Sequence, residues 1–223
     1  EYSKMFNVPF INNAEDKNLV NNGLMNESIT SNNLGLAGNP SISESVMVYR
    51  DLEIAHYVEG KIHIPNVTCS ESIDLIARYK NKKTAVSCEV SPQHLFFKDT
   101  DLKNYNSNLK ISPPLRSDND IDAIIKGLKN GTIDCIASNH QPHRFDDKDK
   151  DFYHASSGMI SFETAFAATN TILSQNNFSI TSILKLFSLN PSKIMNLELS
   201  SIKVGSKAEL VIVDPNKKWT FTE

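Results

Sequence analysis

The sequence predicts an α/β protein built on a parallel β-sheet, and two observations lead to this fold class. Short apolar or β-branched runs alternate along the chain with longer segments of helical periodicity, which is the pattern of successive β/α units. The short runs are rich in apolar or β-branched residues, as expected of strands that are buried on both faces. Four such units amount to half of an eight-fold barrel.

Four segments are predicted as strands because each is short and rich in apolar or β-branched residues. In chain order they are Val8–Asn12, Lys61–Val67, Thr84–Val90 and Thr132–Ser138. Helical segments separate all four of them, so we expect neighbouring strands to run parallel.

The first helices are predicted from their start signals. Ser41–Glu44 and Thr68–Glu71 have the spacing of capping boxes, in which a hydroxyl and a carboxylate satisfy free backbone N–H groups. They predict a helix to about Val58 and a second one through Lys80. Ser117 and Asp120 open a third helix, whose apolar residues recur with helical spacing and which ends before a glycine suited to a left-handed cap. These residues are Ile121, Ile124, Ile125, Leu128 and Gly131.

The last part of the chain is predicted to change character. Two more helices are expected at Ile160–Gln175 and Ser179–Ser188, followed by a turn at Asn190-Pro191 with proline at the first helical position. Beyond Leu199 two strands are predicted that no helix follows, Glu209–Val213 and Lys217–Phe221. We therefore divide the chain into a partial barrel over residues 1–199 and part of a small β appendage over residues 200–223.

Composition and charge favour a globular protein and give no sign of a nucleic-acid or membrane partner. With 223 residues, 39% hydrophobic and 22% charged, the chain has enough apolar material for a packed core. A net charge of −3 gives no reason to expect nucleic acid or an anionic membrane as partner. Cys69, Cys88 and Cys135 are odd in number and lack C-x-x-C spacing, which favours a reducing compartment. With no signal peptide or membrane-length apolar run in view, we expect a cytoplasmic protein.

Polar clusters stand where the predicted strands end, which is where barrel enzymes carry their chemistry. The clusters are Asn12–Asp16, Pro65–Thr68, Ser91–His94 and Ser138–His143, with a further segment at Lys110–Arg116. Their order and spacing resemble the C-terminal half of the dihydroorotases, in the metal-dependent amidohydrolase superfamily. That family has His-Cys-Glu-Asp, His-Val-Ser, Thr-Pro-His-His, Asp-His-Ala-Pro-His and Asn-Pro-Pro-Leu-Arg at the corresponding places. Phe162–Thr164 and Gly205–Leu210 also resemble family segments, so the resemblance covers nearly the whole chain and implies half of a (β/α)8 barrel.

The resemblance assigns roles that this sequence does not support chemically. Asn13 and Asn66 match two histidines that bind metal in the family, and Asn139 matches an aspartate that binds metal and serves as general acid/base. In the family the metal makes hydroxide available and the carboxylate moves its proton to the leaving nitrogen. An asparagine amide is a poor zinc ligand and has no titrating group. We therefore expect no zinc and no other cofactor here, and no acid/base function at Asn139.

The resemblance also implies contacts with substrate. His143, Ser157 and Gly158 match family residues that contact it, whereas Ser112 stands where the family has a substrate-binding asparagine. The family's remaining ligands, a His-x-His pair, would lie upstream of this chain. His140 and His143 could instead suggest a new metal site, but without a neighbouring carboxylate or cysteine we favour packing roles for both.

Three hypotheses follow. The first is an inactive dihydroorotase-like protein of pyrimidine biosynthesis with a structural or assembly role; some bacteria carry such homologues as partners of aspartate carbamoyltransferase, and a homo-oligomer is the other option. The second is an active zinc-dependent cyclic-amide hydrolase, interconverting N-carbamoyl-L-aspartate and dihydroorotate, completed by residues missing from this chain. The third is a degenerate fragment, whose open strand edges would favour aggregation.

Overall fold

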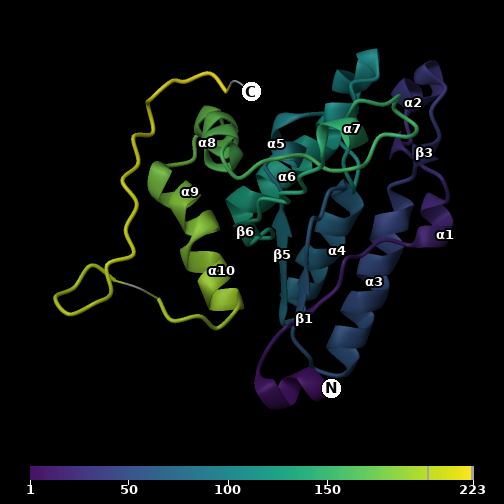
Figure 1. Cartoon of the computed structure of the whole chain (residues 1–223). Coiled ribbons are helices and arrows are strands. Elements are labelled where there is room, and N and C mark those ends of the chain that lie inside the picture. The colour runs from purple at the N-terminus through teal and green to yellow at the C-terminus, as the bar shows by residue number, and fades with distance from the viewer. Residues whose placement is uncertain (200, 222–223) are drawn as a thin grey trace.

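A four-stranded parallel sheet forms the centre of the molecule (Figure 1). The computed structural model describes residues 1–199 and 201–221. Its main sheet has the order β1-β4-β5-β6, with strands Phe10–Ile11, Ile62–Ile64, Val86–Val90 and Cys135–Ile136. The predicted fold class and the four strand positions are confirmed. Each strand is shorter than predicted: β1 and β6 have only two paired residues, β4 ends at Ile64, and β5 reaches the predicted end at Val90.

Five longer helices accompany the sheet. They are α3 (Ile42–Tyr57), α4 (Ser70–Asn81), α6 (Asp118–Asn130), α8 (Ala165–Gln175) and α9 (Ile180–Phe187). The main core lies between these helices and one face of the sheet. Along β5, Val86, Cys88 and Val90 point into this core, whereas Ser87 and Glu89 are less buried and alternate with them. The strands are therefore apolar toward the helices and partly polar on the opposite face.

Short elements occupy the connections. They are α1 (Lys17–Val20), α2 (Ile29–Leu34), α5 (Gln93–Phe96), α7 (Phe145–Lys148), α10 (Leu189–Ile194) and the 3-10 helices Tyr2–Phe6, Asp99–Asn104 and Ser107–Leu109. A second, two-stranded parallel sheet was not predicted; it pairs β2 (Met25–Asn26) with β3 (Gly38–Asn39). Two-residue strands are too short to leave a periodic signal in the sequence.

Only one of the three predicted capping boxes forms. Ser117 and Asp120 make the reciprocal bonds at the start of α6 as expected. The boxes predicted at Ser41 and Thr68 are wrong because Glu44 is buried and turns toward the next helix. Its carboxylate accepts the backbone N–H groups of Thr68 at 2.9 Å and Cys69 at 3.2 Å. The N-terminus of α4 is thus capped by a residue of α3, a long-range contact that spacing along the chain does not reveal.

The later elements differ from prediction in three places. The helix expected from Ile160 begins at Ala165, since the ring nitrogen Nδ1 of His140 accepts the N–H groups of Ser161 and Phe162 and holds them in a loop. Pro191 is the third residue of α10, not the first. In the described part of the tail, Glu209–Val213 and Lys217–Phe221 form no strand, because they find no ladder to join.

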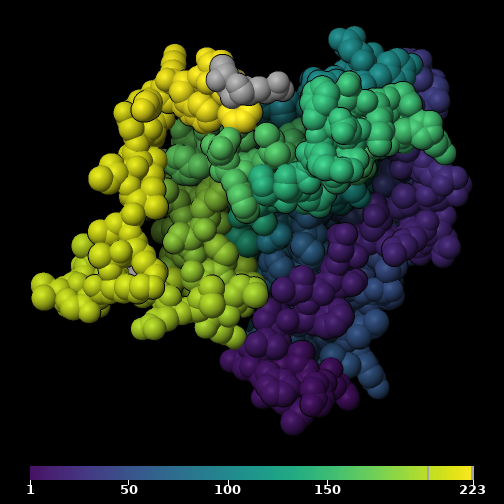
Figure 2. Space-filling view, in the orientation of Figure 1, coloured from purple at the N-terminus to yellow at the C-terminus, as the bar shows by residue number. Residues whose placement is uncertain are grey.

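The tail stands against the outer side of α8 to α10 and is drawn in yellow in Figure 2. Residues 200 and 222–223 of the predicted appendage lie outside the described residues. The division of the chain at residue 199 stays a prediction. Among the described helices, none combines the length and apolarity needed to cross a bilayer.

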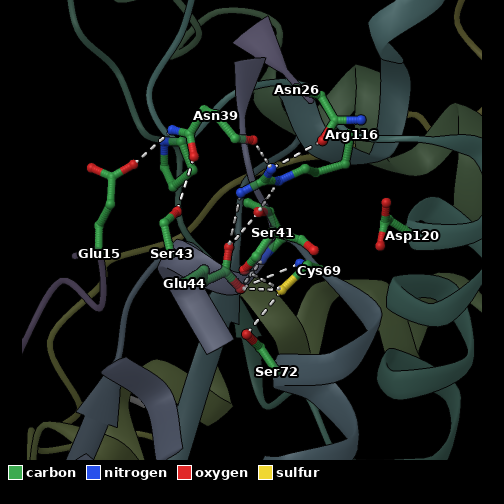
Figure 3. Close-up of polar contacts among 12 residues, drawn as sticks. Glu15, Asn26, Asn39, Ser41, Ser43, Glu44, Cys69, Ser72, Arg116 and Asp120 are labelled. Carbon is green, nitrogen blue, oxygen red and sulfur yellow. Dashed lines mark hydrogen bonds and ion pairs between the residues drawn. The ribbon is translucent and has the colours of Figure 1, made fainter. Parts of the chain in front are cut away.

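A buried arginine joins the segments around the carboxyl ends of the strands, called here the upper end of the sheet (Figure 3). Arg116, only 2% exposed, donates from Nη1 to the side-chain oxygen of Asn26 at 3.0 Å and to the carbonyl of Asn39 at 2.9 Å. Its Nε donates to Thr68 Oγ1 at 3.1 Å. Its Nη2 lies 3.9 Å from the Glu44 carboxylate, which itself accepts a short hydrogen bond from the Thr68 hydroxyl. One guanidinium therefore links β2, β3, α3 and the start of α4.

Replacing Arg116 with methionine should lower the free energy of unfolding by about 3–5 kcal/mol, because Glu44 would remain buried without its positive partner. Urea unfolding followed by circular dichroism measures this loss. Adding Glu44→Gln to Arg116→Met should recover part of the loss, since the uncompensated charge is then gone. The control Lys98→Met removes an exposed ion pair with Asp118 and should cause no measurable change. Equal effects of Arg116→Met and Lys98→Met would contradict the role given to the buried arginine.

Candidate functional site

Two of the three predicted metal-ligand positions meet at the upper end of the sheet. Asn66 follows β4 and Asn139 follows β6, and Asn66 Nδ2 lies 3.4 Å from Asn139 Oδ1. Both residues have left-handed backbone angles, with φ of 49° and 47°. Asparagine tolerates this region better than most residues, because its short polar side chain relieves the strain through local hydrogen bonds.

Two glutamines complete a cluster of carboxamides around this pair. Gln93 Nε2 donates to the carbonyls of Ser138 at 3.1 Å and Asn139 at 3.3 Å. Gln141 Nε2 donates to Asn139 Oδ1 at 3.2 Å. Two buried amide oxygens, Asn66 Oδ1 and Gln93 Oε1, have no hydrogen-bond partner within the described structure. Sequence reasoning named the segments that carry both glutamines but gave neither glutamine a role.

The third position is not brought into this cluster. Asn13 is exposed beyond the end of β1, and its side chain makes no hydrogen bond to Asn66 or Asn139 in the described residues. Its neighbour Asn12 turns away, donating to Asp51 Oδ2 at 2.5 Å on α3. Asp51 also pairs with Arg50. The first strand end is therefore engaged with a helix and not with the other strand ends.

The residues at the strand ends do not fit a zinc ion. Zinc in proteins is held by thiolate, imidazole and carboxylate groups, whereas Asn66, Asn139 and Gln93 offer neutral amide oxygens. The amide N–H₂ of Asn66 points at the oxygen of Asn139 in a single hydrogen bond of 3.4 Å, while Asn66 Oδ1 has no partner in the described structure. Neither amide titrates near neutral pH, and neither is a general base.

The loop after β6 brings together three of the four residues predicted to contact substrate. His143 Nε2 is hydrogen-bonded to the carbonyl of Ser157 at 2.8 Å, and the N–H of Gly158 donates to the carbonyl of Lys110 at 2.9 Å. A Cβ at Gly158, where φ is 148°, would lie 2.6 Å from that same histidine nitrogen, so glycine is needed there. Ser112 is exposed and stands two residues beyond Lys110.

Two lysines that the sequence did not single out hold this loop closed. Lys110 donates its three N–H bonds to the carbonyls of Phe152, Tyr153 and Ala155, at 2.8, 3.0 and 2.7 Å. Lys148 donates to the carbonyls of Ser156 and Gly158, each at 2.9 Å. Burial lowers the pKa of both ammonium groups. The acceptors are backbone carbonyls, which every residue has. The residue types therefore could not predict that Lys110 and Lys148 bind this loop.

The other histidines near the strand ends have packing roles. His140 stacks on Phe162 with ring centroids 4.0 Å apart, and its Nδ1 is occupied by the two backbone N–H groups described above. His94 is buried, with Nδ1 2.7 Å from Ser91 Oγ and Nε2 3.0 Å from the carbonyl of Pro113. Its ring is neutral, because Nε2–H donates to Pro113 while Nδ1 accepts from Ser91. Burial lowers the pKa of His94 to about 4.

Comparison with known proteins identifies the relatives of this chain. A family model described as "Amidohydrolase family" matches residues 38–223. A dihydroorotase of Ruminiclostridium cellulolyticum is 40% identical over 220 residues, covering 98% of this chain and 51% of the relative. A dihydroorotase of Caldicellulosiruptor saccharolyticus is 40% identical over 223 residues, covering 100% and 52%. This chain thus spans about half the length of these curated relatives.

Solved structures agree on the fold. The L-hydantoinase (dihydropyrimidinase) from Arthrobacter aurescens superposes with a TM-score of 0.75 at 21% identity, covering 89% of this chain and 46% of that one. The dihydropyrimidinase from Brevibacillus agri gives a TM-score of 0.76 at 20% identity, with the same coverage. At identities near 20%, these superpositions show only that the fold, a barrel architecture, is shared.

Stability should fall in acid through His94. The unfolded chain binds a proton at this residue below its ordinary pKa of 6.5, whereas the folded chain does so only below about 4. The unfolded state therefore binds more protons between these values, and stability declines as pH falls through this window, by about 3 kcal/mol in total. Urea unfolding at pH 7 and pH 4 measures the decline.

The variant His94→Gln should be less stable than the original at pH 7, but the gap should shrink by about 3 kcal/mol on going to pH 4. The matched control, His154→Gln, changes an exposed histidine paired with Asp151 and should leave that decline as it is. A pH dependence unaltered by His94→Gln would show that another group is responsible.

Proposed function

This chain belongs to the dihydroorotase group of the amidohydrolase family, and from this premise we propose that it is a dihydroorotase-like protein that has lost metal-dependent hydrolysis. Its fold would then serve a structural or assembly role in pyrimidine biosynthesis. The proposal rests above all on one observation, the contact between Asn66 and Asn139 at the strand ends. Two carboxamides bind each other where the resemblance calls for an imidazole and a carboxylate.

Chemistry explains why this contact matters. Hydrolysis of a cyclic amide near neutral pH needs a nucleophile stronger than free water, and a bound metal supplies one by lowering the pKa of its water. The reaction also needs a group that carries a proton to the leaving nitrogen. Asn139 has no proton of suitable pKa to give or take. The strand ends can therefore donate and accept hydrogen bonds but do not support either step.

The assembly role rests on the resemblance to inactive homologues. Phe10 and Ile11 of the edge strand β1 are 58% and 50% exposed. An open cavity of about 470 Å³ beside Phe10 is lined by Ile54 of α3 and Val58 just beyond it, together with Arg50 and Asp51. An apolar strand edge favours association, and the half of the relatives' length outside the match is one candidate to cover it. Aspartate carbamoyltransferase, or a second copy of this chain, is the partner we propose.

A second function is favoured by a different observation. Identity to proteins named dihydroorotase is 40% and extends over 98–100% of this chain, while half of each relative lies outside the matched region. An active zinc-dependent hydrolase, interconverting N-carbamoyl-L-aspartate and dihydroorotate, would need its ligands from that other half. The two functions differ in whether turnover of dihydroorotate accompanies bound zinc.

The first test restores the ligand types. The double variant Asn66→His, Asn139→Asp should bind zinc more tightly than the original, because an imidazole and a carboxylate replace the two amides that meet at the strand ends. Zinc titration of metal-free protein measures this difference. The control variant Asn32→His, Asn119→Asp makes the same changes at exposed positions and should not raise the zinc affinity. Turnover of dihydroorotate by the original chain supplied with zinc would overturn the proposal in favour of the active hydrolase.

The second test concerns assembly. Co-expressed with aspartate carbamoyltransferase of the same organism, the chain should elute with it in size-exclusion chromatography with light scattering, or else elute as an oligomer of its own. Phe10→Glu should weaken either association at least tenfold by placing a charge on the apolar edge. Ile29→Glu, which changes an exposed residue of α2, should have no such effect. A monomer that migrates apart from the carbamoyltransferase would rule out the assembly role.

A further inference from the structure

Three metal-binding side chains meet on the sheet face that points away from the helices. They are His63 of β4, Glu89 of β5 and Cys135 of β6, and their ligand atoms all lie within 4.8 Å of one another. His63 Nε2 is 3.1 Å from Glu89 Oε2. His63 and Cys135 are buried and Glu89 is 19% exposed. Because the three residues come from three different strands, their spacing along the chain does not reveal that they meet.

Strand register produces this meeting. Glu89 pairs directly with Cys135, and His63 pairs with Ser87, which is two residues before Glu89 and therefore on the same face. Cys88 and Val90, on either side of Glu89, point into the core beneath the helices. Ladder hydrogen bonds fix all three backbone positions, so the cluster is held by the most rigid part of the fold.

The histidine is also held in the orientation that a ligand needs. Its Nδ1 lies 2.8 Å from Ser87 Oγ, which leaves Nε2 directed at Glu89. Metal-binding histidines in proteins are typically held in this way through their second nitrogen, which fixes the ring and its tautomer. Ser87 therefore has the position of a supporting residue, and His63 presents its second imidazole nitrogen, Nε2, to the cluster.

We propose that His63, Glu89 and Cys135 form a binding site for one zinc-like divalent cation. Imidazole, carboxylate and thiolate are the three ligand types that zinc prefers. Binding would move the His63 proton from Nε2 to Nδ1, which then donates to Ser87 Oγ, and would break the S–H bond of Cys135 and release that proton to solvent. The thiolate and the Glu89 carboxylate then balance the two charges of the ion. A water molecule would complete the tetrahedron.

The distances are compatible with such an ion. In tetrahedral zinc with bonds of about 2.0–2.3 Å, ligand atoms stand roughly 3.3–3.8 Å apart. The 3.1 Å between His63 and Glu89 is close to this separation. The upper limit of 4.8 Å for the cluster exceeds it by about 1 Å, which rotation of the Glu89 and Cys135 side chains covers without backbone movement.

This site is separate from the amide cluster at the strand ends. His63 precedes Asn66 by three residues, and Cys135 precedes Asn139 by four, which places the cluster about 10–13 Å deeper along the strands. A cation there would join β4, β5 and β6 across the middle of the sheet. The role of this cation is structural, and it does not depend on whether the residues at the strand ends catalyse a reaction.

Cobalt(II) tests the site because thiolate ligation gives it a near-ultraviolet charge-transfer band. The full chain, freed of metal with a chelator, should develop this band with one equivalent of Co²⁺ and lose it when Zn²⁺ competes. Cys135→Ser should abolish the band. The matched control Cys88→Ser changes a buried cysteine on the neighbouring strand that faces the helices, and it should keep the band.

Thiol protection gives a readout that does not need a variant to fold. In partial denaturant, Zn²⁺ should slow alkylation of Cys135 at least tenfold while Cys69 and Cys88 react at unchanged rates relative to each other, as mass spectrometry of the digested chain would show. No cobalt band in the original chain would overturn the proposal. So would a band that survives Cys135→Ser, or equal protection of all three thiols.

Discussion

The buried guanidinium of Arg116 is the contact on which the upper end of the sheet depends. A charge this deep is tolerated only when hydrogen bonds and a counter-charge surround it, and its partners come from four segments far apart in the chain: Asn26, Asn39, Thr68 and Glu44. Thr68 stands two residues after Asn66 and donates in turn to Glu44, which caps α4. This network therefore anchors the chain two residues after Asn66.

The strands and the local helix caps could be predicted from the sequence pattern. The long-range side-chain contacts could not, because their partners lie far away along the chain. Apolar runs located the four strands, and the rule that parallel strands end on one side anticipated that Asn66 and Asn139 would meet. Ser117 and Asp120 cap their own helix, so spacing revealed them. Glu44 caps a helix that begins more than twenty residues later, and Lys110 binds carbonyls more than forty residues away. Such contacts form only in the folded chain, so residue spacing does not reveal them.

The asparagines also show how fold and chemistry separate. At left-handed backbone positions asparagine is among the least strained residues, so Asn66 and Asn139 cost the fold little. Core and network are formed by other residues, including Leu52, Ile64, Ile124 and Arg116. Amides at the strand ends are therefore compatible with an intact scaffold, and a dihydroorotase of Ruminiclostridium cellulolyticum is 40% identical over 98% of this chain. Descent from these enzymes is compatible with a chain that carries out no reaction.

The two lysines beneath the loop after β6 have a consequence for recognition. Five backbone carbonyls between Phe152 and Gly158 are already bound by Lys110 and Lys148. A loop that folds over a bound ligand spends part of the binding energy on its own ordering, whereas this one is ordered beforehand. When a molecule docks there, the loop loses little conformational entropy, because it is already ordered. The loop therefore offers the same fixed shape to a small molecule or to a protein neighbour.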